Sequence, residues 1–441
     1  MNDIKELKKW YIDSFAKFEQ NLNGAKQKLV HQLRKNAIEE FSKLNFPTVK
    51  DEEWRHTNIS PLLKYNFTPF EGKVELSKAD VEKYTFQNMR CCLLVFVNGV
   101  FAPELSESGS LPDGTIVKNI ASAIEENHPA IDEHLGKYAD YKSQIFTSLS
   151  TAFTSDGAFI YVPDGKVIEH PIHILFIAST PANSQVLIQP RNLFVAGKNA
   201  QVTIVEHYAT ASENLYFTNS VTEIYTGENA VVDHIKLQEE SKKAFHVGRM
   251  DAGQERTSNF ASHMISLGAE IARNDFNTRF YGEGCESMLN GLFLVDGSRL
   301  FDAHTMIDHA KPFCNSHEHY KGILDDTSRG VFNGKVMVRK DAQKTNAFQE
   351  NNNIILSREA LVNTKPQLEI FADDVKCSHG ATIGQLDNES LFYLKSRGIG
   401  EETAKTILLH AFASDVIKSI KVSAVKDYVE EILANKFIPG I

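Results

Sequence analysis

Gly197-Lys-Asn-Ala-Gln-Val202 is followed 30 residues later by Gly227-Glu-Asn-Ala-Val-Val232, and this repeat is the strongest indication of the fold. Weaker copies begin at Gly253 and Gly282, so that successive glycines are 30, 26 and 29 residues apart. A repeat of this length with two strand-and-turn units is typical of a β-solenoid, in which each coil buries its apolar residues by stacking on its neighbours. We therefore expect these glycines to occupy equivalent positions, roughly 4.8 Å apart from coil to coil.

A second series supports the same period. Gly268-Ala-Glu-Ile271 and Gly297-Ser-Arg-Leu300 lie 29 residues apart and are offset within the first series. From about Cys91 to Ile383, short apolar alternations such as VTIVE, LFLV, KVMV and LEIF each end at Gly, Asn or Asp, as strands do. An antiparallel sandwich is the alternative, because its strands recur at similar intervals. No clear Asn-Gly hairpin turn joins matched strands, which favours the solenoid.

Helical periodicity marks both ends of the chain. Apolar residues recur at helical spacing from Ile4 to Phe41, interrupted at Asn23-Gly24, which predicts a helical hairpin. Helical spacing returns from Asn388, and Glu401-Glu402 stands where the dipole of a starting helix favours acids. The sequence thus divides into an N-terminal helical region (1–90), a β core (91–387) and a C-terminal helical region (388–441).

Composition narrows the classes of partner. The 441 residues carry a net charge of −10 without a Lys/Arg-rich run, which argues against binding nucleic acid. Gly398-Ile-Gly400 resembles a helix-hairpin-helix, but the acids that follow would repel a phosphate, so a helix that docks a protein partner is favoured. The N-terminus lacks an apolar signal or anchor segment, so we expect a cytoplasmic protein without membrane contact. Its five cysteines are then expected to be reduced.

Cys377-Ser-His379 is the clearest candidate metal-binding feature. Residues i and i+2 of a strand share a face, so Cys377 and His379 can address one ligand while Ser378 points away. A closed zinc or iron–sulfur site needs about four donors, so the others must come from elsewhere in the chain or from a second subunit. The alternative is a small buried thiol beside a hydrogen-bonded histidine.

A second concentration of possible ligands extends from residue 302 to residue 319, and the sequence leaves its function open. It comprises Asp302, His304, Asp308, His309, Cys314, His317 and His319. No Walker A loop, G-x-G-x-x-G, G-x-S-x-G or H-E-x-x-H motif occurs, which predicts a chain without catalytic activity of its own. A secreted polysaccharide lyase or hydrolase on a β-helix and a purely structural interaction protein remain as alternatives.

Several long motifs resemble the SufB/SufD family of the SUF iron–sulfur assembly system, and the resemblance covers essentially the whole chain. The longest is Thr364 to Thr382, TKPQLEIFADDVKCSHGAT, in which Gly380 favours the SufD branch of the family. Supporting stretches are Asp51-Glu-Glu-Trp-Arg55, Tyr320-Lys-Gly-Ile-Leu324, Asn346-Ala-Phe-Gln349 and Phe392-Tyr-Leu-Lys-Ser-Arg-Gly398.

This resemblance implies a right-handed parallel β-helix flanked by helical regions. It implies that the β-helix pairs with a SufB-like subunit, or with a second copy of the chain in isolation, and that the C-terminal helices dock a SufC-like ABC ATPase. His379, with Cys377 as the weaker candidate, is then expected to help hold iron or a nascent cluster transiently, shared with the partner. We expect the ATPase to contact Leu391, Phe392, Tyr393, Arg397 and Gly398, and the apolar positions Ile407, Leu408, Ala411 and Phe412 to pack internally.

Overall fold

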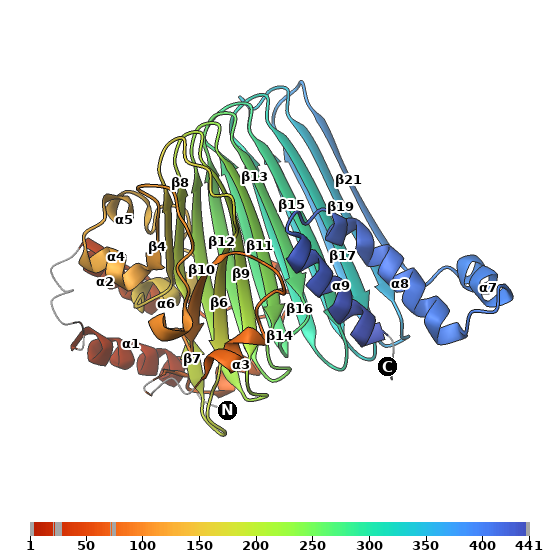
Figure 1. The fold of residues 1–441 in the computed structure, drawn as a ribbon, viewed down its shortest axis with the longest axis horizontal. Coiled ribbons are helices and arrows are strands. Elements are labelled where there is room, and N and C mark those ends of the chain that lie inside the picture. Colours follow the sequence, from red (N-terminus) through yellow and green to blue (C-terminus); the bar gives the residue numbers. More distant parts are fainter. Residues whose placement is uncertain (1–3, 21, 23–28, 71, 73–75, 438–441) are drawn as a thin grey trace.

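The computed structural model describes residues 4–20, 22, 29–70, 72 and 76–437. Its core is a flattened parallel β-solenoid of two long sheets, along which the chain moves steadily from one end to the other (Figure 1). From β8 onward, consecutive strands alternate between the two sheets, and each strand pairs in parallel with the strand two positions along the chain. The mainly β solenoid predicted from the repeats is confirmed.

The first sheet, sheet A, contains eleven strands. They are β1 (Thr68–Pro69), β4 (Ile116–Asn119), β5 (Ala158–Val162), β7 (Val186–Ile188), β8 (Arg191–Ala196), β10 (Tyr216–Thr226), β12 (Phe245–Gln254), β14 (Ile271–Phe280), β16 (Leu300–His309), β18 (Arg329–Val338) and β20 (Leu361–Ile370). Sheet B contains ten strands. They are β2 (Cys92–Val97), β3 (Val100–Phe101), β6 (Ile172–Ala178), β9 (Gln201–Thr210), β11 (Val231–Glu239), β13 (Asn259–Ser266), β15 (Glu286–Val295), β17 (Asn315–Leu324), β19 (Asn346–Ile355) and β21 (Lys376–Gly384).

The register confirms the strong repeats and corrects the weak ones. Ala196 pairs with Thr226, and the Gly227 N–H donates to the Ala196 carbonyl at 2.8 Å, so Gly197 and Gly227 stack as expected. Ile271 pairs with Leu300, which confirms the second series. The expectation for Gly253 and Gly282 is wrong. Gly253 pairs with Tyr225 and Arg279, where stacking with Gly227 and Gly282 was expected. The coils differ in length, so a fixed repeat length does not identify equivalent residues there.

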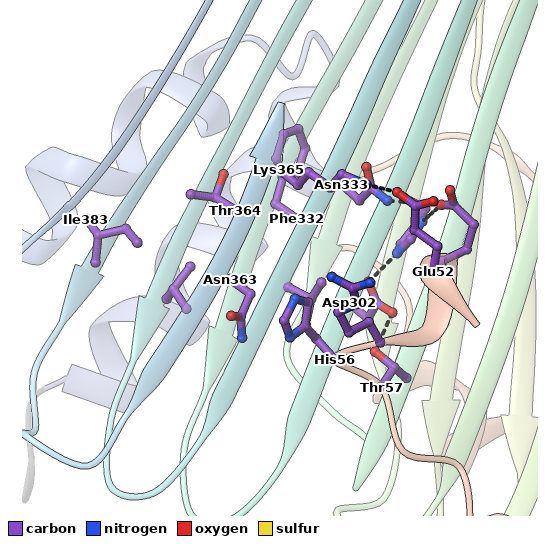
Figure 2. Close-up of a pocket in the computed structure, with 15 residues that line it drawn as sticks. Glu52, His56, Thr57, Asp302, Phe332, Asn333, Asn363, Thr364, Lys365 and Ile383 are labelled. Atoms are coloured by element: carbon purple, nitrogen blue, oxygen red, sulfur yellow. Dashed lines mark hydrogen bonds and ion pairs between the residues drawn. The ribbon is translucent and has the colours of Figure 1, made fainter. Parts of the chain in front are cut away.

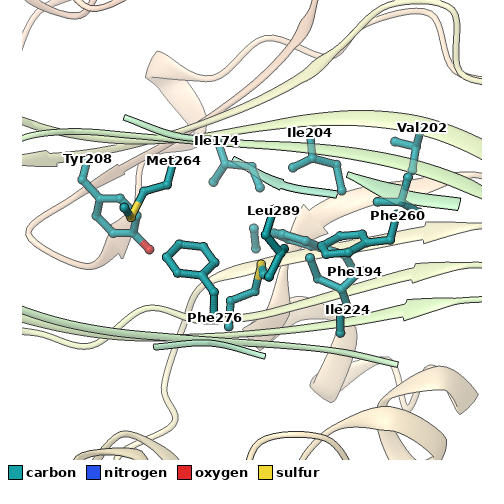
Figure 3. Packing of buried hydrophobic residues seen from close by; sticks show 14 of the residues in the cluster. Ile174, Phe194, Val202, Ile204, Tyr208, Ile224, Phe260, Met264, Phe276 and Leu289 are labelled. Atoms are coloured by element: carbon teal, nitrogen blue, oxygen red, sulfur yellow. The ribbon is translucent and has the colours of Figure 1, made fainter. Parts of the chain in front are cut away.

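The interior of the solenoid holds the main core. Val202, Val232 and Phe260 stand in register on neighbouring strands of sheet B and point inward, where they meet Phe194 and Ile224 of sheet A (Figure 3). Each inner side chain covers the one in the coil before it, so burial accumulates only when coils stack. A single coil would leave this apolar row exposed.

Helices cover the outer faces of both sheets. On sheet A lie α1 (Ile4–Gln20), α2 (Leu29–Lys43) and α6 (Ile145–Ala152), which share one apolar cluster with that sheet. On sheet B, α8 (Glu401–Lys418) and α9 (Ser423–Phe437) form a second cluster with the strands beneath them (Figure 1). The predicted terminal helices are therefore present, although the Asn23-Gly24 break lies outside the described residues. No described helix is long and apolar enough to cross a membrane.

Of the α8 positions expected to pack internally, Phe412 packs against the sheet B cluster, but Ile407 and Ala411 do not. Leu409, Ala413 and Val416 are buried against sheet B, whereas Ile407 is 41% exposed and Ala411 is also exposed. The helix is apolar on more than one side, so helical spacing alone does not select the face that packs on the sheet. The short helices α4 (Ile120–Glu125), α5 (Pro129–His134) and α6 also lie within the stretch where only strands were expected.

The two ends of the solenoid differ. At the N-terminal end the last strands are antiparallel: β4 pairs with β5, and β3 turns back on β2 through Asn98-Gly99, both at positive φ. That is an Asn-Gly hairpin, so the expectation that no such turn joins matched strands is wrong for this pair. At the C-terminal end, β20 and β21 are the outermost strands of sheets A and B and run parallel to their neighbours. The described residues place no further strand on their outer edges.

Candidate functional site

Cys377 and His379 both lie on β21, the edge strand of sheet B. Cys377 pairs with the fully buried Ala347 and joins a small apolar cluster with Val336, Val338 and Leu368, so its side chain points into the solenoid. Burial raises the pKa of the Cys377 thiol above its usual range. A thiol in this state is a poorer metal ligand than a thiolate, which ranks Cys377 behind the histidine.

His379 stands two residues further along, on the same face of the strand, at the exposed rim of the solenoid. Its neighbour in the sheet is Gln349 of β19. Among the described residues, none forms a hydrogen bond or ion pair with the His379 ring. The imidazole is therefore free to take a ligand from outside the chain.

The site is incomplete within this chain. No group of three or more His, Cys, Asp or Glu side chains among the described residues could hold a metal ion. Cys377 and His379 supply at most two donors, and they lie on a strand whose outer edge is open. A metal bound by Cys377 and His379 would therefore need further donors from outside the described residues.

The second concentration of possible ligands does not join this site. Glu318 points into the solenoid, so its neighbours His317 and His319 point outward on the opposite face of β17. The His317 ring stacks on Phe348, with centroids 5.3 Å apart. Cys314 is buried, and its thiol interacts with that of Cys285. These residues occupy separate environments.

Asp302 and His304 lie on the outer face of sheet A, against the segment that contains Asp51 to Arg55. His304 contacts Asp302 at 3.1 Å and Glu53 at 3.2 Å, and the Thr57 hydroxyl donates to Asp302. Burial opposes the charge on Asp302, but His304 and Arg273 lower its pKa to about 2. This buried network fixes the N-terminal segment on the sheet.

A cavity of about 390 Å³ lies beside this network (Figure 2). Its lining combines the N-terminal segment with strands of the last coils, including Asn333, Asn363 and Lys365. In the sequence, residues 51–55 stand out only as a family motif, because contacts between positions this far apart in the chain leave no local pattern. Arg273 also lies over the Trp54 ring, 3.8 Å from its centroid, which secures the segment further.

The predicted partner-binding residues lie on α7 (Asn388–Ser396), which projects beyond the solenoid (Figure 1), and in the two residues that follow it. None of its residues is buried, and Phe392 and Tyr393 are 74% and 57% exposed. Leu391 is half-buried, and Arg397 lies over the Tyr393 ring at 5.2 Å. Gly398, at φ +86°, ends the helix, and the hydrogen bonds from Gly398 and Ile399 to Lys395 and Leu394 complete a Schellman motif.

Comparison with known proteins places this arrangement in a family. Residues 5–174 match the family model described as the SufBD protein N-terminal region, and residues 176–412 match the SufBD core domain of SUF system FeS cluster assembly. The chain therefore belongs to the SufBD family and has a role in iron–sulfur cluster assembly.

Similar individual proteins include members of the SufD branch. The chain is 30% identical to the iron–sulfur cluster assembly protein SufD of Escherichia coli, over 91% of this chain and 92% of that protein. It is 27% identical to SufD of Bacillus subtilis over 97% of both chains. It is also 34% identical to an iron–sulfur cluster assembly SufBD family protein of Synechocystis, over 95% of this chain and 93% of that protein.

Proposed function

We propose that this chain is a non-catalytic subunit of the SUF scaffold, which pairs with a SufB-like subunit through the open end of its solenoid. The observation that carries the proposal is the coincidence of two features at that end. Both sheets finish in strands whose outer edges pair with no other described strand, and His379 lies on one of them.

The open end has the properties of a pairing surface. β20 and β21 are ten and nine residues long, and their outer edges present a row of unsatisfied backbone donors and acceptors. Apolar side chains are exposed there as well: Leu361 by 46%, Ile370 by 39%, Phe371 by 63% and Ile383 by 48%. A second solenoid laid against this end would extend both sheets and cover these side chains. A second copy of the chain could do so when the chain is isolated.

Pairing at this edge would complete the half-site, by which we mean the two candidate donors Cys377 and His379. Iron or a nascent cluster is the cargo of the scaffold, and donors from the partner would join His379, with Cys377 as the weaker candidate. A neutral imidazole holds iron less firmly than a thiolate does, which suits a site that must release its product.

The C-terminal helices supply the second interface in this proposal. The exposed aromatic residues of α7 adjoin Ile407 and Leu408 of α8 along one groove, and this apolar surface fits a protein partner. We assign it to a SufC-like ATPase, with Leu391, Phe392, Tyr393, Arg397 and Gly398 at or beside the contact. ATP hydrolysis would then reside in the partner. The three-region division of the chain and its cytoplasmic location stay predictions.

Co-expression with a SufB-like and a SufC-like subunit tests the proposal. His379→Ala should assemble normally but reduce cluster reconstitution and client maturation, and Cys377→Ser should do so less. Deletion of residues 388–441 should abolish capture of the ATPase and leave pairing with the SufB-like subunit. If His379→Ala matures clients at the parental rate, the chain is a purely structural member of the complex.

A further inference from the structure

A polar column runs inward from His379 through the interior of the solenoid. Leu289, Glu318, Gln349 and His379 stand in direct register on β15, β17, β19 and β21. The column is apolar at Leu289 and becomes polar over the last three coils. The change therefore begins inside the core and ends at the rim where the half-site lies.

Glu318 is an unusual residue to find at such depth. It is 2% exposed, its Oε2 accepts a hydrogen bond from Gln349 Nε2 at 2.6 Å, and its Oε1 has no partner among the described residues. Burial raises its pKa to about 7, against the opposing effects of Thr305 and Gln349. A buried acid with an unpaired oxygen costs stability, so packing alone does not explain its presence.

Gln349 lies between Glu318 and His379, and the fold makes room for it. Its side chain is almost fully buried, and its Oε1 also has no partner among the described residues. Opposite, on β18, Gly334 carries no side chain, and a Cβ there would lie 2.4 Å from Gln349 Nε2. Glycine inside a strand weakens the strand. Gly334 therefore makes room for the side-chain amide of Gln349 at a cost in the stability of β18.

We propose that Gln349 and Glu318 are positioning residues for His379. Neighbours on one face of a parallel ladder are roughly 4.8 Å apart, so the Gln349 amide and the His379 imidazole can meet. Glu318 holds Nε2 of Gln349, and the described residues leave Gln349 Oε1 unpaired. On pairing with the SufB-like subunit, the N–H of the His379 imidazole would donate to this oxygen. That bond fixes one ring nitrogen as the donor and leaves the other for iron, as carbonyl groups commonly do for metal-binding histidines.

This inference rests on the proposed function, because it assigns a role to residues behind the proposed ligand. The test uses the full chain paired with its SufB-like subunit and Co(II) as a spectroscopic stand-in for iron. Gln349→Leu should weaken Co(II) binding about 10- to 100-fold, the usual effect of removing such a partner. Gln349→Asn keeps the amide group and should therefore lose less affinity than Gln349→Leu. Glu350→Leu, on the opposite face of β19, is the matched control and should change nothing.

A second readout separates positioning from folding. With ¹⁵N-labelled histidine, the His379 signal, assigned by its loss in His379→Ala, should report one dominant tautomer in the parent. Gln349→Leu and Glu318→Leu should produce a mixture of tautomers while the thermal unfolding midpoint shows that the chain is folded. If His379→Ala leaves Co(II) binding unchanged, the proposed function fails. If His379→Ala weakens binding but Gln349→Leu changes neither affinity nor tautomer, the present inference fails.

Discussion

Truncation of the two aromatic residues of α7 should separate partner binding from stability. Phe392 and Tyr393 are 74% and 57% exposed, and α7 buries none of its residues, so Phe392→Ala/Tyr393→Ala removes little packing from the free chain. Its free energy of unfolding should change by no more than about 0.5 kcal/mol per position. A buried aromatic residue at the centre of an interface contributes about 2 kcal/mol or more. Because 1.4 kcal/mol corresponds to a tenfold change, the ATPase subunit should bind at least about 30-fold more weakly.

Leu409→Ala is the matched control for this pair. Leu409 is 4% exposed and packs α8 on sheet B, so its truncation should cost about 2–5 kcal/mol of stability. Isothermal titration with the ATPase subunit, at a temperature where both variants are folded, should show parental affinity for Leu409→Ala only. Parental affinity in the double variant would refute the assignment of α7 as the ATPase contact.

Four further expectations follow from individual residues. Gly398→Val should fray the end of α7, because Gly398 has a φ of +86°, and hydrogen exchange over residues 388–398 should become faster. Gly400→Ala should not have this effect, because Gly400 has a φ of −60°. Asp302 has a pKa of about 2, below its ordinary value, so it stabilises the fold above about pH 4 and loses this effect as the pH falls towards 2. Asp302→Asn should therefore lower the urea midpoint by more at pH 7 than at pH 3. Glu318 has a pKa of about 7, above its ordinary value, so its stabilising effect is complete below about pH 4.5 and is lost as the pH rises through 7. The free energy of unfolding should fall by up to about 3 kcal/mol over that window in the parent and change less in Glu318→Gln. The Lys376 N–H donates to the carbonyl of Thr345, just before β19, so alternation along β21 directs the Ala381 N–H to the free edge. Ala381→Pro should therefore weaken pairing with the SufB-like subunit and Ala381→Ser should not, and equal affinities would contradict edge pairing.

The solenoid could be predicted from sequence because its repeats are local. Gly197 and Gly227 each begin a turn that ends in a buried alanine, and the same backbone conformation recurs at Asn199 and Asn229. Such turns keep their pattern wherever the coils have equal length. Where coils differ in length, as around Gly253, the period no longer identifies equivalent positions, and only strand pairing does.

The candidate site could be predicted only in part. The spacing of Cys377 and His379 placed them on one face of a strand, because that alternation is a property of the backbone. Nothing local to residue 318 shows that Glu318 shares a column with His379, since the two are linked only through Gln349 on a third strand. In the same way, the contact of Glu53 with His304 joins parts of the chain that carry no common pattern.

Hydrogen–deuterium exchange over residues 376–384 tests most directly the claim that the open end of the solenoid is the pairing surface. In the free chain, the amides of β21 that face the outer edge should exchange rapidly, because no described strand lies beside them. On addition of a SufB-like subunit, they should become protected, together with those of residues 361–370. Unchanged exchange in both strands, alongside new protection elsewhere on the chain, would contradict the account.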